Sequence, residues 1–127
     1  MSVNKVLQYL KFGDPTKVLQ LAANAMPNAP GAGQVIVKWI AAPINPLDLN
    51  KISGTYPAHK AKFPCIGGSE GVGLIEAVGS GVKGLSKGDK VIPTLLDKPT
   101  WANYALWDAN NVRKVDDRMS IVSDLTI

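Results

Sequence analysis

Two polar side chains stand beside one short predicted helix and are the best candidates for chemistry in this chain. Asn45 comes directly before a proline, and Tyr56 follows Gly54 and precedes a second proline. A tyrosine hydroxyl keeps its proton at neutral pH. It can therefore donate that proton to a developing carbanion, or hydrogen-bond an enolate oxygen. The simpler interpretation, in which Tyr56 packs its ring and shows its hydroxyl to water, stays open at this point.

Metal and thiol chemistry have little support. Cys65 is the only cysteine and His59 the only histidine, so a zinc site built from such residues is close to excluded. Cys65 is expected to be a small buried hydrophobe, because the sequence shows no cationic neighbour that would activate a thiol. His59 lies among lysines and is expected to be exposed, without a nucleophile beside it.

The motif Gly79-Ser-Gly-Val-Lys-Gly84 matches the dinucleotide-binding pattern G-x-G-x-x-G literally. That pattern binds a pyrophosphate only when a strand precedes it and a helix follows it. Here the next residues, Leu85–Asp89, are typical of another turn. The motif is therefore interpreted as a glycine-rich hairpin, and no dinucleotide-binding domain is predicted in this chain.

Bulk composition narrows the class of protein. A length of 127 residues, with 46% hydrophobic and 19% charged residues, indicates one globular domain. The net charge of +4 comes from scattered lysines, which favours a solvated surface over a basic face for a phosphate-bearing ligand. No nucleic-acid motif, membrane-spanning stretch or secretory signal is found, and no organellar presequence precedes the first strand.

Short strands separated by turns dominate the rest of the chain, which predicts a mainly β fold: a small, partly open barrel with one or two short helices. Strands are predicted at Val3–Lys11, Val18–Ala22, Val35–Ala41, Glu70–Val78, Lys90–Pro93, Trp101–Trp107 and Asn111–Val115. Trp39, Trp101 and Trp107 are expected in the core or at its rim.

The one clear helix begins after Asn45. Asn45 suits the N-cap, Pro46 suits the first helical position, and Asp48 adds the negative charge favoured in a first turn. Gly54 is expected to end the helix and to leave Tyr56 on an extended turn.

An ordered set of motifs gives the chain a resemblance. Ala42-Pro-Ile-Asn-Pro-Leu-Asp48 is followed by Ser53-Gly-Thr-Tyr-Pro57, then by Gly67-Gly-Ser-Glu-Gly-Val-Gly73 and by Glu76-Ala-Val-Gly-Ser-Gly-Val82. In this order they resemble the N-terminal, GroES-like catalytic domain of medium-chain dehydrogenase/reductases. The resemblance covers nearly the whole chain.

The resemblance implies a zinc-free site. Zinc-dependent members carry a ligand cysteine where this chain has Asn45 and a ligand histidine where it has Ser69. The chain is thus similar to the zinc-free branch, which holds quinone reductases and 2-enoyl thioester reductases, and most similar to the latter. That branch implies NADPH as cofactor, hydride transfer to a trans-2-enoyl thioester, and Tyr56 as catalytic proton donor. It also implies that Asn45 contacts the nicotinamide region or a substrate oxygen.

The same resemblance implies further properties. Residues 1–118 would form the GroES-like domain and 119–127 the start of a connection to a cofactor-binding domain, so the chain alone is expected to bind cofactor weakly or not at all. The substrate would be a thioester of coenzyme A or of acyl carrier protein, and the full-length protein would be a homodimer. Its location would be mitochondrial by the resemblance, with a cytoplasmic location as the alternative. Two alternatives remain: a zinc-independent NADPH quinone reductase, and a non-enzymatic GroES-like module that binds a partner or itself.

Overall fold

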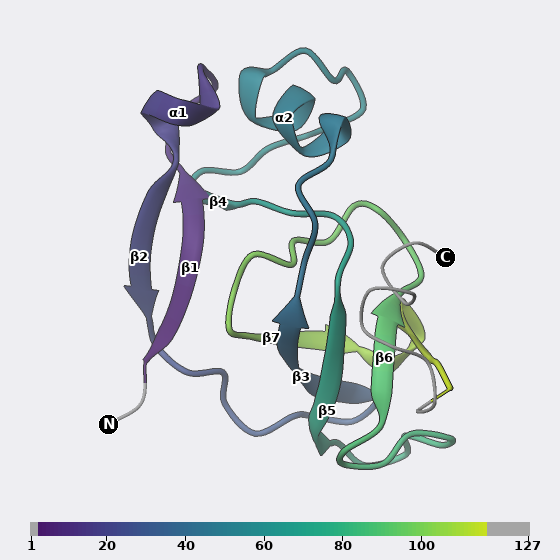
Figure 1. The fold of residues 1–127 in the computed structure, drawn as a ribbon. Coiled ribbons are helices and arrows are strands. Elements are labelled where there is room, and N and C mark those ends of the chain that lie inside the picture. The colour runs from purple at the N-terminus through teal and green to yellow at the C-terminus, as the bar shows by residue number, and fades with distance from the viewer. Residues whose placement is uncertain (1–2, 117–127) are drawn as a thin grey trace.

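Two antiparallel sheets form the body of the molecule, and two short helices lie together at one end of it (Figure 1). The computed structural model describes residues 3–116. The elements are β1 (Asn4–Tyr9), α1 (Pro15–Val18), β2 (Gln20–Asn24), β3 (Gln34–Ala41), α2 (Pro46–Ser53), β4 (Cys65–Ile66), β5 (Val72–Val78), β6 (Lys90–Pro93), β7 (Tyr104–Asp108), the 3-10 turn η1 (Ala109–Asn111) and β8 (Val112–Lys114). The predicted mainly β fold with one or two short helices is confirmed, and the sheets do not close into a full barrel.

The larger sheet has the strand order β7-β3-β5-β6-β8 and carries the main core. Along β3, Val35, Val37 and Trp39 are buried, while the residues between them are at least partly accessible. This is the alternation expected of a strand with one face on a core. Trp39 and Trp107 meet edge to face with ring centroids 5.1 Å apart, which places both in the core as predicted. The remaining core members are Ile75, Val91 and Val112.

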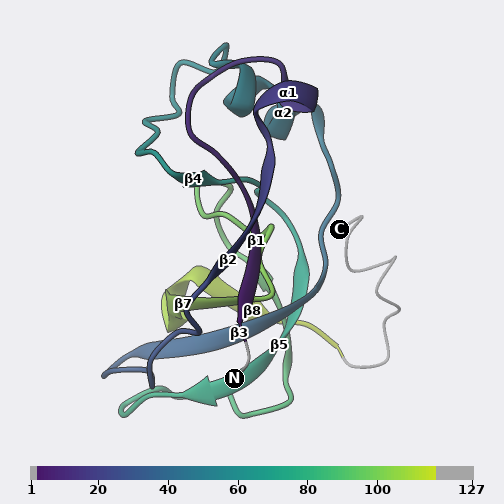
Figure 2. The same ribbon diagram turned by 90° about the vertical axis from the view of Figure 1, so that its left-hand side faces the viewer.

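The smaller sheet has the order β2-β1-β4 and stands beside the first (Figure 2). The segment 100–103 links the two. Leu7 N–H donates to the Trp101 carbonyl at 2.9 Å, and Asn103 N–H donates to the Lys5 carbonyl at 2.9 Å. The buried Asn4 side chain adds an amide bridge, since its Nδ2 donates to the Tyr104 carbonyl and its Oδ1 accepts from the Tyr104 N–H, both at 2.9 Å.

Several predicted boundaries need correction. The predicted turn around Asp14 contains α1, because the Asp14 carboxylate accepts from the Thr16 N–H at 2.9 Å and caps a one-turn helix. That helix uses Val18, so the second strand runs over Gln20–Asn24 instead of Val18–Ala22. The strand predicted from Trp101 begins only at Tyr104, because residues 100–103 cross to β1.

The glycine-rich motif, the absence of a membrane-spanning stretch and the C-terminal boundary are the remaining sequence predictions. Gly79–Gly84 joins the paired strands β5 and β6 and is not followed by a helix, so the hairpin interpretation is confirmed. Within residues 3–116, no helix is long and apolar enough to cross a membrane. The predicted connection at 119–127, and the end of the domain at 118, lie outside the described residues.

Candidate active site

Helix α2 places both predicted site residues, one at each end. Asn45 is the N-cap with extended φ and ψ of −108° and 158°, and its backbone N–H donates to Asp48 Oδ2 at 2.9 Å. This bond is the return half of a capping box. At the other end Gly54 has a φ of 84°, and its N–H donates to the carbonyl of Asn50 at 3.1 Å. The helix therefore begins and ends where the sequence predicts.

A buried chain of polar groups fixes α2 to the strand entry before β5. Asp48 is 1% exposed and Ser69 is 0% exposed. Ser69 Oγ donates to Asp48 Oδ1 at 2.7 Å and accepts from Lys51 Nζ at 3.0 Å. Lys51, itself buried, also donates to the Leu96 carbonyl. A buried ion is stable only when it is hydrogen-bonded. This carboxylate–hydroxyl–ammonium chain therefore holds α2, the residue Ser69 before β5 and the backbone at Leu96 in one arrangement.

The Asn45 side chain turns toward the same region. Its Nδ2 donates to Glu70 Oε2, and Thr100 Oγ1 donates to the Glu70 carbonyl at 2.8 Å. Asn45 is half-buried.

Tyr56 lies on the loop after α2, as predicted. Its side chain is 38% exposed, so the ring is accessible to a molecule in solution. The loop is held by its backbone, because the His59 N–H donates to the Tyr56 carbonyl at 3.1 Å. No hydrogen bond recorded among residues 3–116 joins the hydroxyl of Tyr56 to Asn45. The two predicted site residues thus lie beyond opposite ends of α2, and no described hydrogen bond joins their side chains.

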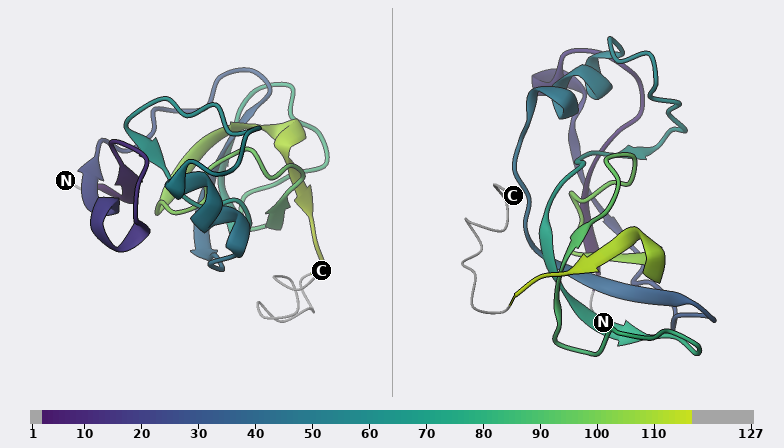
Figure 3. Two further views of the ribbon diagram at one scale, coloured as in Figure 1. Left: turned by 90° about the horizontal axis from the view of Figure 1, so that it is seen from above. Right: turned by 90° about the vertical axis from the view of Figure 1, so that its right-hand side faces the viewer.

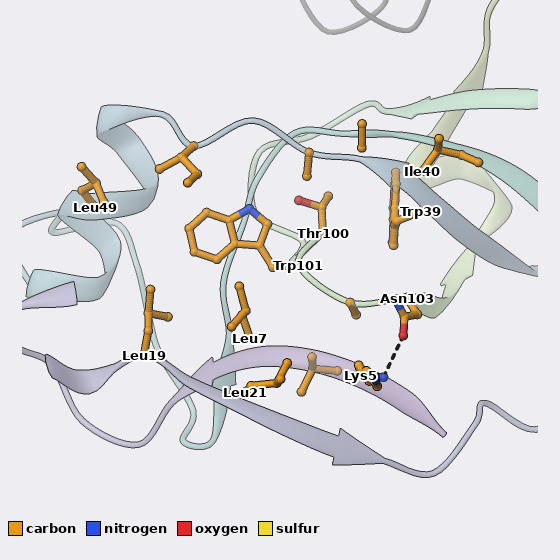
Figure 4. Close-up of a pocket in the computed structure, with 15 residues that line it drawn as sticks. Lys5, Leu7, Leu19, Leu21, Trp39, Ile40, Leu49, Thr100, Trp101 and Asn103 are labelled. Atoms are coloured by element: carbon orange, nitrogen blue, oxygen red, sulfur yellow. Dashed lines mark hydrogen bonds between the residues drawn. The ribbon is translucent and has the colours of Figure 1, made fainter. Parts of the chain in front are cut away.

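An apolar groove in the described chain is lined by neither residue (Figure 4). It measures about 540 Å³ and lies between the two sheets, below α2. Trp101 stands in its centre between Leu7, Leu19 and Leu49. The groove suits apolar groups, and it holds no acid or histidine that could move a proton.

Two expectations about single residues are wrong. His59 is only partly exposed, and its Nε2 lies 2.8 Å from the hydroxyl of the buried Tyr9. Cys65 is half-buried, and its Sγ donates to the same hydroxyl at 3.3 Å. Burial, reinforced by the contact with Cys65, raises the pKa of Tyr9. Burial and then the charge of Lys51 lower the pKa of His59. Sequence analysis did not predict this cluster, because Tyr9 is 50 residues from His59 and 56 from Cys65 in the chain.

The described residues hold no group of three or more histidine, cysteine, aspartate or glutamate side chains that could bind a metal ion. The position where zinc-dependent relatives would carry a ligand histidine holds Ser69, and its hydroxyl is engaged by Asp48 and Lys51.

The alcohol dehydrogenase GroES-like domain family matches residues 31–117 of the chain. The chain belongs to this family. Among curated relatives, the family member "Enoyl-[acyl-carrier-protein] reductase, mitochondrial" of Caenorhabditis elegans is 44% identical over 118 residues, which cover 93% of this chain and 34% of the relative. The chain thus spans about a third of the length of the curated relatives it matches.

Solved structures of relatives have the same fold as this GroES-like domain. A complex of Etr1p with NADP and crotonyl-CoA aligns with a TM-score of 0.90 and 27% identity, covering 99% of this chain and 40% of that one. A putative NADPH:quinone reductase from Bacillus thuringiensis aligns with a TM-score of 0.86 and 34% identity, covering 98% and 37%. The second structure is more similar in sequence, and the first is more similar in fold.

Proposed function

We propose that this chain is the substrate-side domain of an NADPH-dependent 2-enoyl thioester reductase, an oxidoreductase that saturates the C2–C3 double bond. The observation that carries the proposal is the 44% identity to an enoyl-[acyl-carrier-protein] reductase over 93% of the chain. The accessible Tyr56, on the loop directly after α2, is consistent with it. Asn45 and Ser69, which stand where the family resemblance places two zinc ligands, support a zinc-free site.

The cofactor does not fit the described residues as a whole molecule. The glycine motif at 79–84 lies in a hairpin connection, so its backbone does not present the helix N-terminus that a pyrophosphate needs. When bound elsewhere in a longer protein, NADPH would supply a hydride to the C3 carbon of the substrate. From this domain, we propose that only Asn45 lies close enough to contact the nicotinamide end.

In the proposed reaction the domain donates a proton and positions the substrate. The hydroxyl of Tyr56 donates a proton to the C2 carbon, where negative charge develops, or hydrogen-bonds the thioester oxygen. The chain Lys51–Ser69–Asp48 holds α2 in place, and with it the two ends of the helix that carry Asn45 and Tyr56. Positioning of this kind matters because displacement of a catalytic group by about 1 Å can cost 100-fold in rate.

The remaining properties of the whole protein are also proposals. The substrate would be a thioester of coenzyme A or of acyl carrier protein, in fatty acid synthesis. The names of the curated relatives favour a mitochondrial location. A homodimer stays a prediction from the family resemblance.

A chimera tests the proposal. In it, this chain replaces the matching third of the Caenorhabditis elegans relative, and NADPH oxidation is followed with crotonyl-CoA. Tyr56→Phe is expected to lower kcat by about 100-fold or more, the usual contribution of a positioned proton donor. Tyr104→Phe, in a half-buried strand residue, is the control and should leave kcat unchanged. An unchanged kcat in Tyr56→Phe would remove Tyr56 from the mechanism.

The quinone reductase is the second candidate, because the Bacillus thuringiensis structure has higher identity than the Etr1p complex. The same chimera is assayed with an ortho-quinone. Reduction of the quinone without reduction of crotonyl-CoA would favour this alternative and contradict the first proposal.

A further inference from the structure

A second group of reactive side chains lies behind α2, in a cavity of about 250 Å³ that is separate from the apolar groove. Tyr9, His59 and Cys65 all line it. They come from β1, from the loop after Tyr56 and from β4, so only the folded chain brings them together. Neither the proposed function nor any predicted site uses these three residues.

The three side chains form a connected hydrogen-bonded path. Cys65 Sγ donates to Tyr9 Oη at 3.3 Å, and Tyr9 Oη lies 2.8 Å from His59 Nε2. The thiol also lies 3.8 Å from the same His59 nitrogen. Tyr9 is 1% exposed, so its hydroxyl is shielded from water and directed to these two partners. With Nε2 unprotonated, the path runs in one direction, from S–H through O–H to the imidazole.

Besides the three members of the path, charged side chains line the cavity. Burial, and then the charge of Lys51, lower the pKa of His59 and so favour the neutral imidazole, which is the form that accepts a proton. Lys51 and Lys62 line the same cavity and would stabilise a thiolate. Two acids, Asp48 and Asp97, also line it. Asp48 is engaged by Ser69 and by the Asn45 backbone, so its charge is partly compensated.

We propose that Cys65 is a nucleophilic thiol, activated by His59 through Tyr9, that is modified by soft electrophiles such as α,β-unsaturated carbonyl compounds entering this cavity. The thiol proton passes to Tyr9 Oη as the Tyr9 proton passes to His59 Nε2. The sulfur then bonds to the β-carbon of the electrophile, and the electrons of the C=C bond move to the carbonyl oxygen. The resulting enolate takes back the proton from His59. The step needs no oxidant or metal, and it is independent of the proposed reductase activity.

The test uses the 127-residue chain and N-ethylmaleimide, which is an α,β-unsaturated carbonyl compound. Cys65 is the only cysteine, so one mass increment reports modification of that thiol. His59 is the only histidine, so it is the only imidazole that can act as the base. An unperturbed thiol is only a few per cent ionised at pH 7. We therefore expect the folded chain to react about 10-fold faster than the same chain in denaturant, after allowing for the lower nucleophilicity of a stabilised thiolate.

Three variants separate the relay from simple accessibility. His59→Gln should bring the rate at pH 7 down several-fold toward that of the denatured chain, and Tyr9→Phe should do the same. Lys60→Gln is the matched control, because Lys60 is exposed and does not line the cavity. If Tyr9→Phe fails to fold, His59→Gln decides, since its side chain is only partly buried and its fold can be checked by circular dichroism.

Two outcomes would overturn the proposal. One is a folded chain that reacts no faster than the denatured chain. The other is a His59→Gln variant that reacts as fast as Lys60→Gln, which would mean that the imidazole does not activate the thiol.

Discussion

Removing the hydroxyl of Ser69 should be among the most damaging single-atom changes in the domain. Ser69 is fully buried, and its Oγ lies 2.7 Å from Asp48 Oδ1 and 3.0 Å from Lys51 Nζ. Ser69→Ala leaves a buried carboxylate short of one donor and a buried ammonium short of one acceptor. Neither ion is abandoned, because Asp48 keeps the Asn45 N–H and Lys51 keeps the Leu96 carbonyl.

The size of the effect follows from these two bonds. A hydrogen bond to a charged group contributes about 1.5–3 kcal/mol, so two of them amount to about 3–6 kcal/mol. The partners that each ion keeps move the expectation to the lower end, about 3 kcal/mol off the free energy of unfolding. For a domain of this length that corresponds to a fall in Tm of about 10 °C.

Urea denaturation of the 127-residue chain measures this cost. Ser80→Ala is the matched control, because Ser80 is exposed and its recorded hydrogen bond uses the backbone carbonyl. Ser69→Ala should lower the free energy of unfolding less in a Lys51→Met variant than in the parent chain, because the ammonium that Ser69 contacts is then absent. If Ser69→Ala costs no more than the Ser80→Ala control, the buried chain does not stabilise the fold and the reasoning is refuted.

Two further predictions concern a backbone contact and a pH response. Gly79→Ala should lower the free energy of unfolding by about 2 kcal/mol or more, because the new Cβ would lie 1.8 Å from the Gly31 carbonyl oxygen. In the control Gly31→Ala, the new Cβ meets only the end of the Gln34 side chain, at 3.1 Å, and the cost should be far smaller. Equal urea midpoints for the two variants would contradict this prediction. The pKa of His59 is lower in the folded chain than its ordinary value of 6.5. As the pH falls below about 6.5, the unfolded chain therefore binds a proton first, and the free energy of unfolding decreases. His59→Gln should remove that decrease, and a decrease of unchanged size would show that another group causes it.

Local patterns predicted the central elements well. Val35, Val37 and Trp39 alternate with more accessible residues, and the sheet buries that face. Asn45 and Gly54 marked the ends of α2, because N-caps and left-handed C-caps depend on only a few neighbouring residues. For the same reason the loop position of Tyr56 was predictable.

Features made by distant segments were not predictable. Strand β4 has only two residues, Cys65 and Ile66, and exists because β1 lies beside them. Lysines are almost never buried, so the sequence pattern of α2 gives no reason to place Lys51 in the interior. Its burial depends on hydrogen bonds to Ser69 and to the Leu96 carbonyl, which lie far from it in the chain. The contact between Tyr9 and Cys65 joins residues from different strands, which no spacing rule indicates.

The segment 100–103 also bears on how the molecule comes apart. It donates and accepts hydrogen bonds on both sides: with β1 through Leu7 and Asn103, and with β3 through the Trp39 N–H to the Asn103 carbonyl at 2.9 Å. Figure 3 shows the molecule from above and from another side. Neither sheet can therefore open at this edge without exposing backbone groups of the other. Amide protons in β1 and β3 should exchange with solvent through one shared opening event, so the two sheets form a single cooperative unit.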